Sequence, residues 1–244
     1  MDRCRQKKWI MICKVYWKFF FWVFFPLCFS CSKGNEEKPT DLTEIEPFYI
    51  QNLGVNFMPW DTQSSVVGDF RFTPHFSKLF SEFGDLAKTP EGNYKELPHF
   101  SYIVQKDATI KAIAEGEVVS VYFQLVGDYD LAIQSENDPK WIVYYDHISE
   151  VLVEEGDHVY PGMPLGKPKF VLDSLGFIEI MINNTEDKHS YCPFEVFNPA
   201  TSVDFQQQVI RLIKDWEHYK NDTSIYNEES FIISGCRKKS ILSY

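Results

Sequence analysis

Histidine is the residue type in this chain whose positions could support catalysis or metal binding. The 244 residues include six histidines, and an imidazole can move a proton near neutral pH or give a lone pair to a metal. Four of them stand at no metal-ligand spacing from one another: His75, His158, His189 and His218. The sequence contains no His-x-His pair, no Ser-His-Asp pattern and no glycine-rich phosphate loop. The candidates are therefore His147, within Tyr-Asp-His, and His99.

Two glycine turns follow His147 closely. Gly156-Asp157 and Pro161-Gly162 interrupt short β-branched runs within residues 145–166. Turns of this kind place a residue at positive φ, which glycine adopts at little steric cost. Short β-branched runs separated by such turns predict a compact β-hairpin directly after His147.

Residues 99–183 extend this pattern on both sides of the hairpin. Runs of β-branched and aromatic residues alternate with turns rich in glycine or aspartate, which predicts a meander of short antiparallel strands. The predicted strands cover residues 109–114, 117–123, 129–134, 141–146, 151–153 and 177–182. The aromatic-rich residues 48–98 predict a wrap of loops and short strands around this core.

One helix is expected, over residues 203–220. Apolar residues recur at helical spacing on one face: Phe205, Val209, Leu212, Ile213 and Trp216. Residues 201–204, Thr-Ser-Val-Asp, fit a capping box at its start. We expect this face to pack against the β core, with residues 201–244 forming a C-terminal helix and tail.

The hairpin resembles the core of the M23 peptidases, LytM-like zinc endopeptidases that cut peptidoglycan cross-links. Tyr145-Asp146-His147 matches the family's Tyr-x-His segment, and residues 112–118 match its Ala-x-Ala-x-Gly-x-Val turn. The resemblance implies a mainly β fold, an M23-like or barrel-sandwich antiparallel core at 99–183 within a domain at 48–200. The hairpin is more loosely similar to the lipoyl hammerhead, but neither the Gly116 turn nor the Gly156 turn carries the lysine that such domains modify.

The resemblance also implies a zinc ion, held by the His and Asp of His-x-Gly-x-Asp and by the second His of His-x-His. Leu175 and Phe177 stand at the His-x-His positions, followed by Glu179 at the family's glutamate. Neither Leu nor Phe has a lone pair to give a metal, and a catalytic zinc needs three such ligands and one open position.

The other two ligand positions are also altered. A gapless alignment places Leu97 and Ser101 there, whereas a two-residue deletion places His99 at the histidine and Ile103 at the aspartate. We therefore predict no zinc cofactor and no family-type catalysis, with His99 as the one candidate ligand. His147 is then either a vestigial residue that hydrogen-bonds in the core or a catalytic one.

A binding groove is a second possibility for the same region. In the family a groove crosses the sheet beside the Tyr-x-His strand, and Trp141, Tyr145 and Asp128 could line its equivalent. Aromatic faces and carboxylates are groups that bind sugars and peptides. Alternation along the strand allows only one set of its side chains to face outward, so part of this set must pack in the core.

The first 30 residues have the features of an export signal. Six basic residues precede or flank an apolar run at residues 19–29, which is too short to span a bilayer. Residues 29–34, Phe-Ser-Cys-Ser-Lys-Gly, resemble a bacterial lipoprotein cleavage site with Cys31 as the lipidated residue, although Cys28 departs from the usual leucine. Residues 31–47 are polar and predict a flexible tether. A single-pass anchor starting near Trp9 is the alternative, and both place the protein at the cell envelope.

Charge and cysteine usage agree with export. The net charge is −11 and becomes more negative without the signal, which argues against nucleic-acid binding. Cys192 and Cys236 are the two cysteines left after the signal and the lipidated residue, and an even pair in an oxidising compartment predicts a disulfide.

Three functions remain open from the sequence. The first is a non-enzymatic lipoprotein, lipid-anchored in the periplasm or at the outer-membrane surface, that binds or regulates through peptidoglycan or an envelope protein. The second is an active zinc endopeptidase with a metal site rebuilt from His99, His147 and an acidic residue. The third is a structural or adaptor β-domain of hammerhead type that handles no peptidoglycan.

Overall fold

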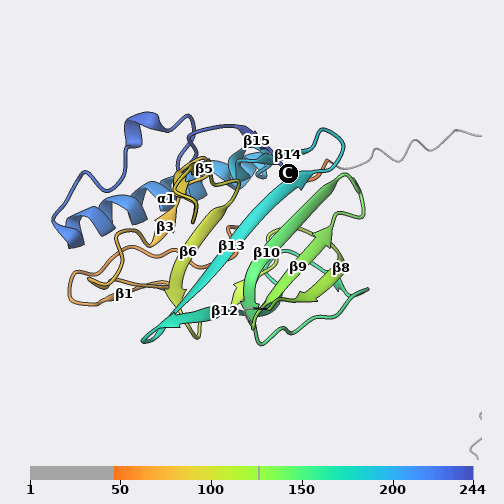
Figure 1. Cartoon of the computed structure of the whole chain (residues 1–244), viewed down its shortest axis with the longest axis horizontal. Coiled ribbons are helices and arrows are strands. Elements are labelled where there is room, and N and C mark those ends of the chain that lie inside the picture. The colour runs from red at the N-terminus through yellow and green to blue at the C-terminus, as the bar shows by residue number, and fades with distance from the viewer. Residues whose placement is uncertain (1–46, 126, 244) are drawn as a thin grey trace, which may run out of the picture. The chain divides into compact units, whose positions relative to one another are not determined.

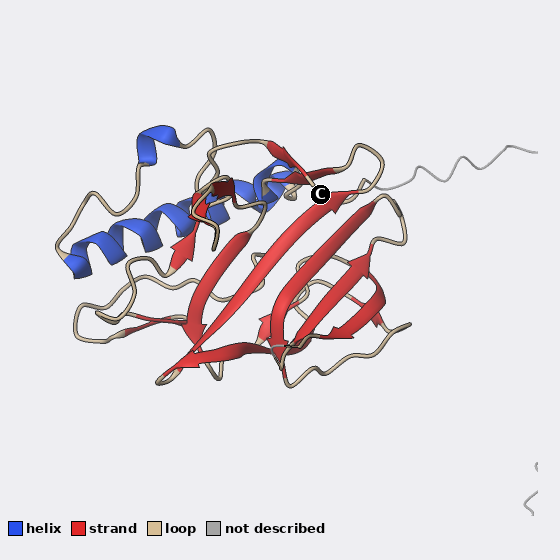
Figure 2. Cartoon of the chain, in the orientation of Figure 1, coloured by secondary structure: helices blue, strands red, loops and turns tan. Residues whose placement is uncertain are grey.

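A long antiparallel sheet dominates the computed structural model, which describes residues 47–125 and 127–243. β13 (Leu175–Asn184) lies at its centre, between β6 (Phe100–Gln105) and β10 (Trp141–Ser149), as Figure 1 shows. The sheet continues from β10 through β9 (Tyr129–Gln134) to β8 (Gly116–Phe123). The predicted mainly β fold with one α-helix is confirmed (Figure 2).

The remaining elements are short, apart from one helix and one hairpin strand. The short strands are β1 (Val66–Val67), β2 (Phe70–Arg71), β3 (Phe80–Ser81), β4 (Leu86–Lys88), β5 (Tyr94–Glu96), β7 (Ile110–Lys111), β11 (His158–Val159), β14 (His189–Tyr191) and β15 (Ser240–Leu242). The longer ones are β12 (Pro164–Leu172), which forms a hairpin with β13, and α1 (Pro199–Lys220). Two short 3-10 helices are η1 (Pro193–Glu195) and η2 (Glu228–Ser230).

Alternation along β13 separates a core face from a second face. Ile178, Ile180 and Ile182 are buried, while Phe177, Glu179 and Met181, which alternate with them, are half-buried. Successive side chains of a strand point to opposite faces, so the Ile-x-Ile-x-Ile pattern places every isoleucine on one side. The opposite face of β13 carries the residues that matter for the candidate site.

The helix covers the end of the core near β3 and β6 (Figure 1). It begins earlier than predicted, because Asn198 rather than the 201–204 sequence caps it: the Asn198 side chain accepts a hydrogen bond from the Ala200 N–H. Pro199 follows at the first helical position, where its missing N–H costs nothing. Val209, Leu212, Ile213 and Trp216 are buried, as their spacing predicted.

Several strand predictions differ from the structure. Residues 129–134 form β9 as predicted, but residues 151–153 are not in a strand and β7 is shorter than expected. β6 and β12 were not predicted. β12 contains Pro164 and Pro168, and proline normally argues against a strand because it cannot donate a ladder hydrogen bond.

Cys192 and Cys236 form a disulfide, as predicted. It joins the residue before η1 to the C-terminal segment, across a separation of 44 residues. The described residues belong to one compact unit. Within the described residues, no helix combines the length and apolar character needed to span a bilayer. The predicted signal at 1–30, Cys31 and the tether up to residue 46 lie outside the described residues.

Candidate functional site

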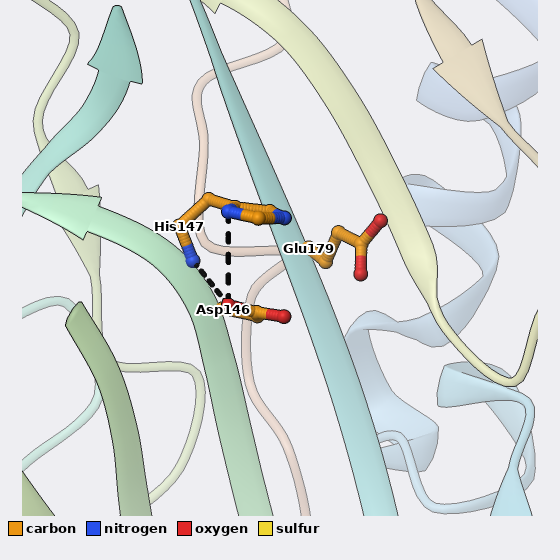
Figure 3. A group of neighbouring side chains, drawn as sticks. All are labelled: Asp146, His147 and Glu179. Atoms are coloured by element: carbon orange, nitrogen blue, oxygen red, sulfur yellow. Dashed lines mark hydrogen bonds and ion pairs between the residues drawn. The ribbon is translucent and has the colours of Figure 1, made fainter. Parts of the chain in front are cut away.

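A β-bulge in β10 turns two consecutive polar residues toward the same neighbour. Regular alternation would send Asp146 and His147 to opposite faces of the sheet. The pairing of β10 with β9 shifts register between Tyr145 and Ile148, and His147 adopts a φ of 69°. Such an extra residue bends the strand and re-aims its side chains. As a result, Asp146 and His147 both lie beside Glu179 of β13 (Figure 3).

Asp128, one residue before β9, fixes the orientation of the His147 ring. Its side chain is fully buried, with Oδ2 at 2.6 Å from His147 Nδ1 and 3.0 Å from Lys169 Nζ. Burial raises the pKa of Asp128, but the hydrogen bonds and charges of His147 and Lys169 outweigh burial and hold that pKa below its usual value. An ionised carboxylate only accepts hydrogen bonds, so Nδ1 carries the proton. In the neutral ring, Nε2 therefore keeps a free lone pair.

Glu179 and His99 complete the polar cluster. His99 Nε2 lies 3.3 Å from Glu179 Oε1. Burial, together with the charges of Lys95 and His147, lowers the pKa of His99 to about 4. Burial also raises the pKa of Glu179 to about 7, with a further increase from Asp146 and opposing effects of His147 and Lys95. Near pH 7 the contact thus joins a neutral imidazole to a carboxyl group that is partly protonated, and is not an ion pair.

The pair of residues next to Glu179 on the same face of β13 and β6 is apolar. The Phe177 ring lies beside the His147 ring, with centroids 5.2 Å apart. Phe177 pairs directly with Ile103 of β6. Leu175, two residues earlier on β13, is buried. The polar cluster therefore ends at Glu179, and the side chains that precede it on the same face of β13 are hydrocarbon.

Part of this β domain matches a known protein family. Residues 100–169 match the model of peptidase family M23. This segment contains Asp128, Asp146 and His147, whereas His99 and Glu179 lie outside it. The chain thus carries an M23 peptidase-like domain, which confirms the resemblance found in its sequence. None of the curated proteins matches the chain.

Solved structures similar to this chain are distant in sequence. The solution structure of lysostaphin is 17% identical with a TM-score of 0.34, over 42% of this chain and 43% of that chain. Csd3 of Helicobacter pylori is 12% identical with a TM-score of 0.42, over 75% and 45%. A zinc-containing peptidase from Vibrio cholerae is 18% identical with a TM-score of 0.36, over 54% and 37%. This chain spans less than half the length of each of the three.

The family's zinc ligands do not fit the residues present. With His99 at the first ligand position, Ile103 takes the place of the aspartate and Phe177 that of the metal-binding histidine. Pairing of β6 with β13 puts Ile103 and Phe177 directly opposite each other. Two of the three ligand positions are therefore adjacent in the sheet, and both are occupied by hydrocarbon side chains. The residues at these positions therefore provide at most one ligand for a family-type zinc.

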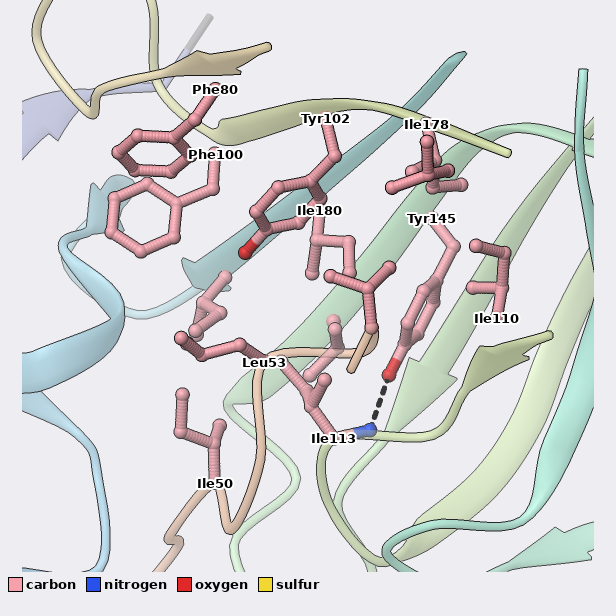
Figure 4. Close-up of a cluster of buried hydrophobic side chains, with 14 of the residues drawn as sticks. Ile50, Leu53, Phe80, Phe100, Tyr102, Ile110, Ile113, Tyr145, Ile178 and Ile180 are labelled. Carbon is pink, nitrogen blue, oxygen red and sulfur yellow. Dashed lines mark hydrogen bonds between the residues drawn. The ribbon is translucent and has the colours of Figure 1, made fainter. Parts of the chain in front are cut away.

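Two of the predicted groove residues lie on the core side of β10 instead. Tyr145 is fully buried, and its hydroxyl oxygen accepts a hydrogen bond of 2.7 Å from the Ile113 N–H (Figure 4). Trp141 stacks on Phe48, with ring centroids 5.3 Å apart. The third, Asp128, belongs to the polar cluster but is buried beside His147.

Asp146 and Glu179 are members of the cluster that the sequence marked only as neighbours of the family's histidine positions, not as site residues. Each is the one acidic residue of its strand, with apolar or aromatic residues before it, and β10 and β13 pair them directly. The presence of one acidic residue on each of two neighbouring strands was the signal in the sequence that could have identified them. The bulge that brings His147 to the same place has no comparable signal in the sequence.

Replacement of Tyr145 by Phe is expected to lower the free energy of unfolding by about 1–2 kcal/mol, because the buried Ile113 N–H loses its acceptor. Urea unfolding followed by circular dichroism measures this change. Tyr144→Phe, next to it on the half-buried face, is the matched control, with an expected change below about 0.5 kcal/mol. Equal effects of the two substitutions would contradict the assignment of Tyr145 to the core.

Proposed function

We propose that this protein is a non-enzymatic binding or regulatory module, tethered at the cell envelope, whose M23 peptidase-like domain recognises peptidoglycan or an envelope protein. The observation that carries the proposal is the pair formed by Ile103 and Phe177 at the family's metal-binding positions. Without a zinc ion there, the family's way of activating water is absent. A peptidase domain that has lost its zinc ligands no longer activates water, but its substrate-binding surface can remain.

The face of the sheet that carries the cluster supplies groups suited to binding. Asp130, Tyr144 and Asp146 are half-buried there on β9 and β10. Carboxylates and aromatic hydroxyl groups bind amides and sugar hydroxyls through hydrogen bonds, which suits glycan strands or their peptide stems. The tether is part of the proposal: lipidation at Cys31 would hold the domain close to the cell wall.

Co-sedimentation with purified peptidoglycan tests the proposal. The wild-type protein should pellet with sacculi at low salt, and Tyr144→Ala combined with Asp130→Asn should reduce the bound fraction. Leu86→Ala, an exposed residue on β4, is the control and should leave binding unchanged. If no protein pellets even at low salt, peptidoglycan is excluded as the ligand and the adaptor function is favoured.

An active endopeptidase is the second candidate, and one observation favours it. Ligand atoms of Asp146, His147 and Glu179 lie within 4.8 Å of one another, so a metal could bind beside the family's position. Cleavage of peptidoglycan separates this candidate from the first, whichever ligand is bound.

A further inference from the structure

Unsatisfied polar atoms gather around His147. Among the described residues, five buried side-chain atoms have no hydrogen-bond partner, and three of them are His99 Nε2, Asp128 Oδ1 and Asp130 Oδ1. His99 is 8% exposed, and its Nε2 makes no hydrogen bond although Glu179 Oε1 is 3.3 Å away. Asp130 lies on β9 opposite the bulge that carries Asp146 and His147. Buried polar atoms are rarely left unpaired in folded proteins, so a group of them in one place marks a polar site that can accept an ion or water.

Three residues of the same region bring possible metal-ligand atoms close together. One atom each from Asp146, His147 and Glu179 lies within 4.8 Å of the other two. Figure 3 shows the His147 ring and the Asp146 carboxylate extending toward β13, where Glu179 is located. A metal ion about 2.0–2.2 Å from each ligand atom fits among atoms at such separations after small side-chain adjustments.

The surroundings of His147 match those of a metal-binding histidine. Its Nδ1–H donates to Asp128 Oδ2, which leaves Nε2 as the free ligand atom. A carboxylate on the second ring nitrogen is the usual partner of a histidine that binds metal, because it fixes the ring and raises its basicity. Lys169 pairs with Asp128 at 3.0 Å, so this lysine offsets the charge of Asp128 rather than that of Asp146 or Glu179.

We propose that Asp146, His147 and Glu179 bind one divalent transition-metal ion. One imidazole and two carboxylates form a ligand set that suits zinc or manganese. The site differs from the family's zinc site: Glu179 lies two residues along β13 from Phe177, and two of the three ligands are carboxylates that the family does not use. The proposal is independent of cleavage, because an ion held here can stabilise the bulge or contact a bound ligand without activating water.

Calorimetric titration of the metal-stripped full-length protein with zinc chloride tests the site. We expect the wild type to bind a zinc ion. Glu179→Gln and Asp146→Asn should each lower the zinc affinity by at least 10- to 100-fold, which is the loss that removal of a residue supporting a metal ligand typically causes. His158→Ala is the matched control. His158 also contacts two carboxylates, with Nδ1 at 2.6 Å from Glu136 Oε1 and Nε2 at 3.4 Å from Glu115 Oε1, but it is exposed.

All variants are prepared in the same form of the chain, so any zinc that binds elsewhere in it cancels in the comparison. A thermal unfolding scan in EDTA verifies that each variant folds, and zinc should raise the Tm of the wild type and of His158→Ala but not that of Glu179→Gln. The proposal is wrong if the wild type binds no zinc, if Glu179→Gln binds it as tightly as the wild type, or if His158→Ala abolishes binding.

Discussion

Removal of the Cys192–Cys236 disulfide is expected to lower the free energy of unfolding by about 4 kcal/mol. The bond closes a loop across 44 residues, and in the chain-entropy account a crosslink of this length restricts the unfolded chain by about that amount. Both cysteines are fully buried, so the double substitution to alanine introduces no polar group into their apolar surroundings. Urea unfolding of the double variant beside the wild type measures the difference.

The wild type in a reducing agent is the control for this experiment, since it loses the bond without losing the side chains. Its midpoint should shift toward that of the double variant. A loss below about 1 kcal/mol in both samples would mean that hydrogen bonds of the C-terminal segment, such as that from Arg237 N–H to the Phe83 carbonyl oxygen, already hold it as firmly as the crosslink does.

Replacement of Glu82 by Ala is expected to cost about 3 kcal/mol. The Glu82 side chain is fully buried and accepts hydrogen bonds from Lys78 Nζ at 2.7 Å and Arg237 Nη2 at 2.9 Å. Removing one partner of a buried pair leaves uncompensated charge in a poorly solvated place. Asp85 still pairs with both cations, and both reach solvent in part, so we expect the lower end of the range measured for such pairs.

An exposed pair in the same region provides the control for Glu82. Glu96 pairs with Lys238 near the C-terminal segment, and both side chains are about a third or more exposed. Glu96→Ala should change stability by less than about 1 kcal/mol, because solvent screens the pair. Comparable losses for Glu82→Ala and Glu96→Ala would show that burial of Glu82 contributes nothing to its effect.

The sequence predicted the architecture better than the site. Short β-branched runs and glycine turns predicted β8, β9, β10 and part of β13, because local turn chemistry and side-chain alternation decide these elements. β12 was missed because its prolines oppose a strand, and long-range pairing with β10 and β13 outweighs that local preference. The helix was predicted, but its start was placed too late because Asn198 competes with the capping box as the N-cap.

The site could be predicted only in part, since it depends on contacts that the spacing of residues does not reveal. The family comparison singled out His147 and the losses at Leu175 and Phe177. The contact between His147 and Asp128 requires the bulge at His147, which a pattern of period two cannot predict. The same alternation explains why Tyr145, one residue before Asp146, lies in the core instead of a groove.

Digestion of purified peptidoglycan is the most direct test of the central claim, that the M23 peptidase-like domain binds without cleaving. Sacculi are incubated with the protein in buffer containing zinc, and the released muropeptides are identified by chromatography and mass spectrometry. We expect the protein to be retained on the sacculi and the muropeptide profile to match that of untreated sacculi. New cleavage products that disappear with His147→Ala, but persist with His158→Ala, would contradict the account and establish an active peptidase.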